Sequence, residues 1–132
     1  MLEILSLDNP QTILVIEDKL SFAYRLIQWL EGGGHTVYGY AGVFDIEGDI
    51  LKGVKPLGET PLDVDLLKIN VCFLDHYFEG DAYTGTTLTK ELVPLGIKVC
   101  GMSSVDPANQ SMLRYGAVCA YRKDVLGRML SL

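Results

Sequence analysis

Two short apolar runs, each ending at a carboxylate, constrain the fold of this chain most strongly. Residues 13–16 are followed by Glu17 and Asp18, and residues 71–74 are followed by Asp75. Continuous apolar runs of this length are typical of strands buried on both faces, as in the middle of a parallel sheet. In open α/β sheets, ligands bind just beyond the carboxyl ends of such strands. We therefore expect these carboxylates at the edge of the sheet where chemistry occurs.

The rest of the chain alternates between strand and helix patterns. Strands are predicted for residues 12–18, 35–40, 70–75, 97–102 and 117–122, and helices for residues 19–31, 42–55, 85–95, 106–115 and 124–132. The helix over 42–55 has the weakest pattern, because Gly48 lies in its interior. Residues 56–68 are predicted to form a loop with one short helical turn. This alternation predicts an α/β fold with a parallel sheet covered by helices on both faces.

Composition narrows the class of protein. The chain has 132 residues, 48% of them hydrophobic, which suits a single domain over residues 1–132 with a real core. The net charge of −6 argues against nucleic-acid binding. No apolar run reaches membrane-spanning length, and the first ten residues lack a basic segment, so a cytoplasmic protein without membrane contact is predicted. The cysteines Cys72, Cys100 and Cys119 are predicted to be free buried thiols of a reducing compartment.

Functional side chains follow four of the predicted strands. They are Glu17 and Asp18 after the first strand, Asp75 after the third, Ser103 after the fourth and Lys123 after the fifth. Three adjacent carboxylates repel each other unless a cation lies among them, and oxygen ligands suit Mg²⁺. A lysine and a hydroxyl opposite them suit a phosphoryl group held on an aspartate. The pattern predicts a site that binds Mg²⁺ and carries a phosphoryl group.

This ordered set of side chains resembles the receiver domain of two-component response regulators. The resemblance covers residues 12–123, and Gly85 and the pair Gly116-Ala117 also match the family pattern. It implies a flavodoxin-like, doubly wound sheet of five parallel strands in the order 2-1-3-4-5. It also implies a His-to-Asp phosphorelay, in which a histidine kinase or a phosphotransfer protein donates the phosphate. The output would be binding to a downstream protein, and the chain would assist only its own phosphorylation and dephosphorylation.

The resemblance also implies a role for each site residue. Asp75 would be the phosphoacceptor, Ser103 would donate a hydrogen bond to the phosphoryl group, and Lys123 would pair with it. The implied Mg²⁺ ligands are Glu17, Asp18, Asp75 and the backbone carbonyl of Tyr77.

The chain departs from the family pattern at several positions. The loop over residues 76–84 is longer than usual, Asp124 replaces the proline that normally follows the lysine, and Ala120 occupies the aromatic switch position with Tyr121 beside it. These departures leave open a receiver-like interaction module that works without phosphorylation. A third alternative is a phosphatase similar to the haloacid dehalogenase family. Such enzymes need a second acid two residues after the nucleophile, where this chain has Tyr77.

Each residue also has an ordinary structural interpretation. Glu17 and Asp18 could be an acidic pair at a helix start, Ser103 part of a turn and Lys123 a surface lysine. The receiver interpretation depends on the whole set occurring in order at the strand ends.

Overall fold

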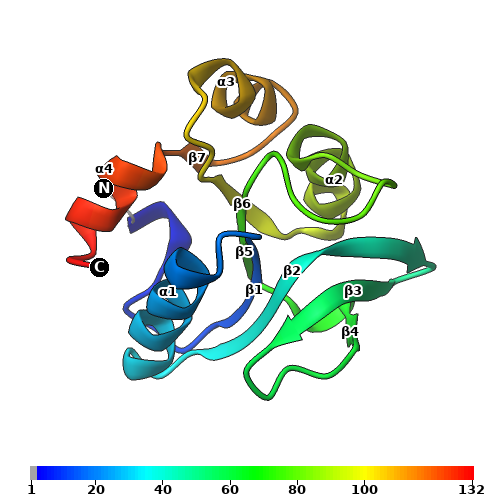
Figure 1. Cartoon of the computed structure of the whole chain (residues 1–132), viewed down its shortest axis with the longest axis horizontal. Coiled ribbons are helices and arrows are strands. Elements are labelled where there is room, and N and C mark those ends of the chain that lie inside the picture. Colours follow the sequence, from blue (N-terminus) through cyan, green and yellow to red (C-terminus); the bar gives the residue numbers. More distant parts are fainter. Residues whose placement is uncertain (1–2) are drawn as a thin grey trace.

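The computed structural model describes residues 3–132, which form a central sheet with helices on both of its faces (Figure 1). Within this range the sheet has seven strands in the order β4-β3-β2-β1-β5-β6-β7. The strands are β1 (Thr12–Ile16), β2 (Thr36–Glu47), β3 (Ile50–Leu57), β4 (Asp63–Asp65), β5 (Val71–Leu74), β6 (Lys98–Gly101) and β7 (Cys119–Ala120). The helices are α1 (Leu20–Gly32), α2 (Gly85–Leu92), α3 (Asp106–Arg114) and α4 (Lys123–Met129), with 3₁₀ turns at Glu3–Leu5, Leu66–Lys68 and Val93–Leu95.

Strand β1 lies at the centre of the two-sided core. Ile13 and Val15 pack with the buried residues of α1 and α4, whereas Leu14 and Ile16 pack on the opposite face with those of α2 and α3. Successive side chains of a strand point to opposite faces, so an unbroken apolar run fills both layers. Figure 1 shows the same division, with α1 and α4 on one side of the sheet and α2 and α3 on the other. The prediction of a strand buried on both faces is confirmed.

The parallel part of the sheet has the predicted strand order. β1 pairs in parallel with β2 and with β5, and β6 pairs in parallel with β5 and with β7. These pairs give the order β2-β1-β5-β6-β7. This is the predicted order 2-1-3-4-5. The sheet continues beyond β2 through β3 and β4, which both run antiparallel to their neighbours.

The predicted helix over residues 42–55 was wrong, because this segment forms a β-hairpin. β2 extends through Glu47, turns at Gly48-Asp49 and returns as β3 from Ile50, and Glu47 pairs with Ile50 across the turn. Gly48 has a φ of 61°, which glycine adopts without strain. A two-residue loop that begins with glycine is a favoured connection between antiparallel strands. Gly48, which made the helix pattern weak, is therefore the first residue of the hairpin turn.

The hairpin also closes the core on the side of α2. Tyr40 and Leu51 are fully buried, together with Val64 of β4. The Tyr40 ring lies directly over Gly53, where an added Cβ would be 1.9 Å from the ring atom Cδ1. Residues 56–68 were predicted as a loop with one helical turn. They contain the end of β3, the short strand β4 and a 3₁₀ turn.

The bounds predicted for the remaining helices and strands agree with the structure to within a few residues. The exception is the last strand, which is reduced to Cys119–Ala120.

Cys72 and Cys100 are buried free thiols as predicted, but Cys119 is only half-buried, because its strand lies at the sheet edge. No helix within residues 3–132 is both long and apolar enough to cross a lipid bilayer.

Candidate functional site

The backbone of the sheet places Glu17 and Asp75 side by side. The Glu17 amide donates to the Tyr40 carbonyl at 3.0 Å, and the Asp75 amide donates to the Ile16 carbonyl at 3.0 Å. The parallel ladder thus continues one residue past the apolar part of β1 and β5. The Glu17 side chain is fully buried, Asp75 is 4% exposed and Asp18 is exposed. One carboxylate oxygen from each of the three lies within 4.8 Å of the others.

Lys123 forms ion pairs with two of these carboxylates. Its Nζ is 2.9 Å from Asp75 Oδ2 and 3.0 Å from both carboxylate oxygens of Glu17. Burial alone would lower the pKa of Lys123. The hydrogen bond to Asp75 and the charge of Glu17 outweigh burial and raise this pKa above its ordinary value. The sequence placed Lys123 at the end of a strand, but it is the first residue of α4.

Glu17 is the most perturbed acid of the site. Burial, followed by the charge of Asp75, raises its pKa to about 8, although the Lys19 amide and the Lys123 ammonium act in the opposite direction. Its Oε1 atom is buried and accepts no hydrogen bond from the described residues, despite the nearby ammonium. A buried carboxylate oxygen that accepts no hydrogen bond, together with two further carboxylates, is a suitable set of ligands for a hard divalent cation. The residues present therefore fit Mg²⁺.

Asp75 begins a loop whose backbone is tightly packed. Its Oδ1 accepts a hydrogen bond from the His76 amide at 2.8 Å, and Gly85 at the start of α2 donates to the His76 carbonyl at 2.8 Å. A Cβ at Gly85 would lie 2.4 Å from the Asp75 carbonyl oxygen, which explains why glycine occupies this position. The Tyr77 side chain is 63% exposed and stacks edge-on against the His76 ring. Its backbone carbonyl follows Asp75 by two residues, and its role as a ligand stays a prediction.

The same loop is bonded to the hairpin, a connection that the sequence did not reveal. The Val43 amide donates to the Glu79 carbonyl at 3.0 Å, and the Glu79 amide donates to the Ala41 carbonyl at 3.2 Å. Between these two bonds lies Gly42, where a Cβ would be 1.9 Å from the Glu79 carbonyl oxygen. Lys55 of β3 pairs with the Glu79 carboxylate at 3.0 Å. The loop that follows Asp75 thus forms an isolated parallel β-bridge with β2, between Glu79 and Gly42.

Ser103 stands past the end of β6, at the same edge of the sheet, and is buried. Its hydroxyl accepts a hydrogen bond from the Val105 amide at 3.1 Å, which leaves the hydroxyl hydrogen available for donation. Asn109 fixes the Ser103 backbone through two bonds of 2.9 Å, accepting from its amide and donating to its carbonyl. Sequence reasoning missed Asn109. The only signal for it was its place on the same helical face as Ala108 and Met112.

Of the predicted site residues, the structure brings Glu17, Asp18, Asp75 and Lys123 into one cluster. Ser103 and Tyr77 lie on the loops that follow β6 and β5, at the same edge. Such an arrangement offers a nearly buried carboxylate as a nucleophile, a fixed ammonium beside it and oxygen ligands for a cation. These are the groups that acyl phosphate formation on an aspartate needs.

Comparisons with solved structures agree with this fold. No protein-family model matches the sequence, and no curated protein matches it significantly. Solved structures do match. A putative response regulator from Chloroflexus aurantiacus is 18% identical, with a TM-score of 0.61, over 94% of this chain and 100% of that chain. A two-component response regulator from Clostridium difficile is 14% identical, with a TM-score of 0.60, over 92% of this chain and 93% of that chain.

A third match carries a modified site. It is a response regulator protein from Burkholderia pseudomallei with a phosphorylated aspartic acid, a calcium ion and citrate. It is 16% identical, with a TM-score of 0.57, over 89% of this chain and 65% of that chain. At these identities the likeness establishes the fold. The chain therefore has the fold of a response regulator receiver domain, with strands β3 and β4 added beyond β2 at one edge of the sheet.

Proposed function

We propose that this chain is a phosphoacceptor receiver that signals by protein–protein interaction. The observation that carries the proposal is the Lys123 ammonium, held 2.9 Å from Asp75 and 3.0 Å from Glu17 at the carboxyl edge of a receiver-type sheet. A partly buried lysine that forms ion pairs with two buried acids, one after each of two strands, is costly to assemble for stability alone. It is well suited to stabilise the additional charge of a phosphoryl group.

In the proposed reaction an Asp75 oxygen attacks the phosphorus of a phosphohistidine on a kinase or phosphotransfer protein. The new P–O bond forms while the P–N bond breaks, and the imidazole nitrogen leaves with that electron pair. Lys123 and the Ser103 hydroxyl bind the transferred oxygens. Mg²⁺ held by Glu17, Asp18 and Asp75 would supply positive charge to the same group. The phosphorylated aspartic acid and the cation of the Burkholderia pseudomallei structure support this assignment.

Beryllium fluoride tests the proposed function without a kinase, because it mimics an acyl phosphate on an aspartate. A structural neighbour of this chain, the DrrB receiver domain, is described as activated by BeF₃. We expect a bound fluoride signal by ¹⁹F NMR when beryllium fluoride and Mg²⁺ are both present. If the spectrum shows only free fluoride species, Asp75 does not form the adduct and the proposed function is wrong.

Mg²⁺ is expected to bind the free protein at millimolar concentrations and to stabilise it. The ion relieves repulsion among Glu17, Asp18 and Asp75 that exists only in the folded state. A concentration of ten times the Kd adds about 1.4 kcal/mol to the free energy of unfolding. Calorimetric titration measures the affinity, and Glu17→Gln is expected to weaken it. Absence of heat and of any stability change at millimolar Mg²⁺ would contradict the metal assignment.

Activation is expected to change the site loops more than the last strand. Ala120 has no side-chain rotamer to switch, and Tyr121, which follows β7, packs against the core on the side of α1 and α4. The loop over residues 76–84 is bonded to Ala41 and Val43, so the hairpin amides should respond with it. Amide exchange with and without beryllium fluoride should show increased protection at residues 41–43, 76–84 and 103–106. Equal changes over residues 117–122 would show that the last strand takes part in the switch.

A further inference from the structure

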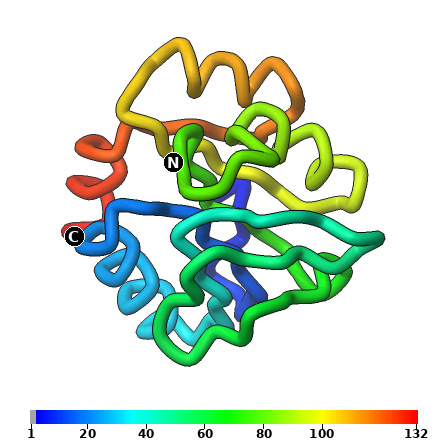
Figure 2. The backbone as a smooth tube through the Cα atoms, turned by 45° about the vertical axis from the view of Figure 1, so that its right-hand side comes forward, coloured from blue at the N-terminus to red at the C-terminus, as the bar shows by residue number. Residues whose placement is uncertain are grey.

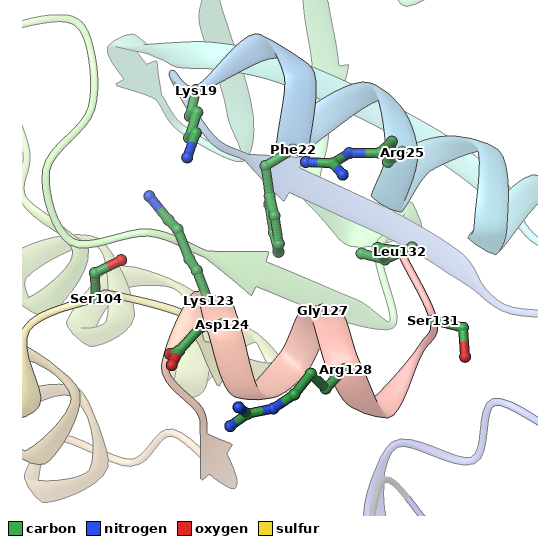
Figure 3. A pocket seen from close by; sticks show the side chains of 10 residues that line it. All are labelled: Lys19, Phe22, Arg25, Ser104, Lys123, Asp124, Gly127, Arg128, Ser131 and Leu132. Atoms are coloured by element: carbon green, nitrogen blue, oxygen red, sulfur yellow. The ribbon is translucent and has the colours of Figure 1, made fainter.

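A cavity of about 650 Å³ lies between α1 and α4, next to the cluster of acids, and shares Lys123 with it (Figure 3). Its wall on the α1 side is formed by Lys19, Phe22 and Arg25, and α4 contributes Lys123, Gly127 and Arg128. Figure 3 shows the Lys19 and Lys123 side chains extending toward each other from the two walls. The two helices cover the same face of the sheet. Figures 1 and 2 show both of them on the side of the molecule opposite the tip of the hairpin.

The positive charge of this cavity is only partly compensated. Of its four cationic side chains, Lys123 alone is neutralised, by Glu17 and Asp75. Within residues 3–132 no carboxylate lies within ion-pair distance of Lys19, Arg25 or Arg128. The one acidic residue of the lining, Asp124, is already paired with Arg122 at 3.3 Å.

The local charge is opposite to that of the whole protein. The chain carries a net charge of −6, yet three unpaired cations line one cavity. Like charges gathered in a concave site repel each other and focus a positive potential, which attracts an anion. The Arg25 Nε donates to the Ser21 carbonyl at 3.1 Å, which leaves the two terminal nitrogens of its guanidinium available to a ligand.

The size and donors of the cavity indicate the class of anion. Its volume lies within the range of about 300–1,000 Å³ that is usual for small-molecule sites. Guanidinium groups bind phosphate oxygens in pairs, and two arginines line this cavity from different helices. A nucleic-acid polymer is disfavoured by the net negative charge of the rest of the surface.

We propose that the α1–α4 cavity binds a small phosphate compound with more than one negative charge, such as a diphosphate. This binding goes beyond the receiver function and requires neither Asp75 nor its phosphorylation.

The test is a titration of inorganic diphosphate into the whole chain without divalent cations, followed by calorimetry and by NMR of backbone and arginine side-chain signals. We expect saturable binding, with the largest chemical-shift changes at Lys19, Arg25 and Arg128. Arg25→Gln and Arg128→Gln should each weaken binding about tenfold, because each removes a charge-assisted contact. The matched control is Arg114→Gln on α3, an exposed arginine on the other side of the sheet, which should leave the affinity unchanged.

Four results would overturn this proposal. The first two are no saturable binding at millimolar diphosphate and an equal loss of affinity in Arg114→Gln. The other two are chemical-shift changes of the wild-type protein centred outside the cavity and tighter binding of citrate than of diphosphate. The chemical-shift changes of the wild-type protein locate the binding site even if a variant unfolds. Asp75→Asn should bind diphosphate at least as tightly as the wild type does, because it removes one of the two carboxylates that neutralise Lys123. Failure of the phosphoacceptor proposal and failure of this one are therefore distinguishable.

Discussion

Asp75→Asn is expected to abolish phosphorylation completely. The substitution removes the carboxylate that would attack phosphorus, and an amide oxygen is a far weaker nucleophile. The shape of the side chain is retained, so the surrounding loop should keep its structure. Intact-mass spectrometry after treatment with acetyl phosphate and Mg²⁺ measures the result. Asp81→Asn is the matched control, because Asp81 is an exposed carboxylate of the same loop, and it should be phosphorylated as the wild type is.

The same variant should change stability little. It loses the ion pair between Asp75 and Lys123, but it also removes the negative charge that Asp75 presents to the buried Glu17. Lys123 keeps both oxygens of Glu17 as partners. We therefore expect a change in the free energy of unfolding within about 1 kcal/mol. Full phosphate incorporation into Asp75→Asn would mean that another residue is the acceptor.

Gly42→Ala is expected to destabilise the protein by about 2–3 kcal/mol, because the new methyl group has no room. Its Cβ would lie 1.9 Å from the Glu79 carbonyl oxygen and 2.5 Å from the carbonyl carbon. These are backbone atoms held by the bonds of Glu79 to Ala41 and Val43, so they cannot move aside without breaking the pairing. The loop after Asp75 would separate from the hairpin, and slower phosphorylation by acetyl phosphate should accompany the lost stability.

Urea unfolding of Gly42→Ala and of Gly32→Ala compares a crowded glycine with an open one. Gly32 ends α1, and an added Cβ there meets no atom within 4 Å. Gly32→Ala should be neutral or slightly stabilising, since alanine loses less backbone entropy than glycine on folding. Equal stabilities of the two variants would show that the loop is not held against β2 in solution.

The centre of the fold and the acidic cluster were predictable because they depend on local patterns. The apolar runs of β1 and β5 are long enough only for buried strands, and a parallel sheet brings their ends together. Glu17 and Asp75 therefore meet without any knowledge of their contacts. The helices α1 and α2 follow from apolar residues at helical spacing and from the glycines near their ends.

The hairpin was not predictable in the same way. Val43, Phe44, Ile46 and Leu51 fit a helical face, while Gly48-Asp49 fits a hairpin turn, and the sequence alone gives both patterns similar weight. The outcome depends on pairing between β2 and its neighbours. That pairing buries Tyr40 over Gly53 and leaves Phe44 67% exposed, next to a register shift in β2.

The partners of the site loops depend on distant contacts as well. Asn109 reaches Ser103 only because α3 packs against the end of β6, and Lys55 reaches Glu79 only because the hairpin lies beside the loop. Lys55 even adopts a φ of 51°, an unusual backbone conformation for a residue with a side chain. No spacing in the sequence encodes such contacts, so Asn109 and Lys55 were identified from the structure.

The central claim is that Asp75 carries the phosphoryl group. The most direct measurement is peptide mapping by mass spectrometry after the wild-type chain is treated with acetyl phosphate and Mg²⁺. We predict one phosphoryl group per chain, located on Asp75 and absent when Mg²⁺ is chelated. A chain that stays unmodified at saturating donor, or that carries its phosphate on another residue, would contradict the account.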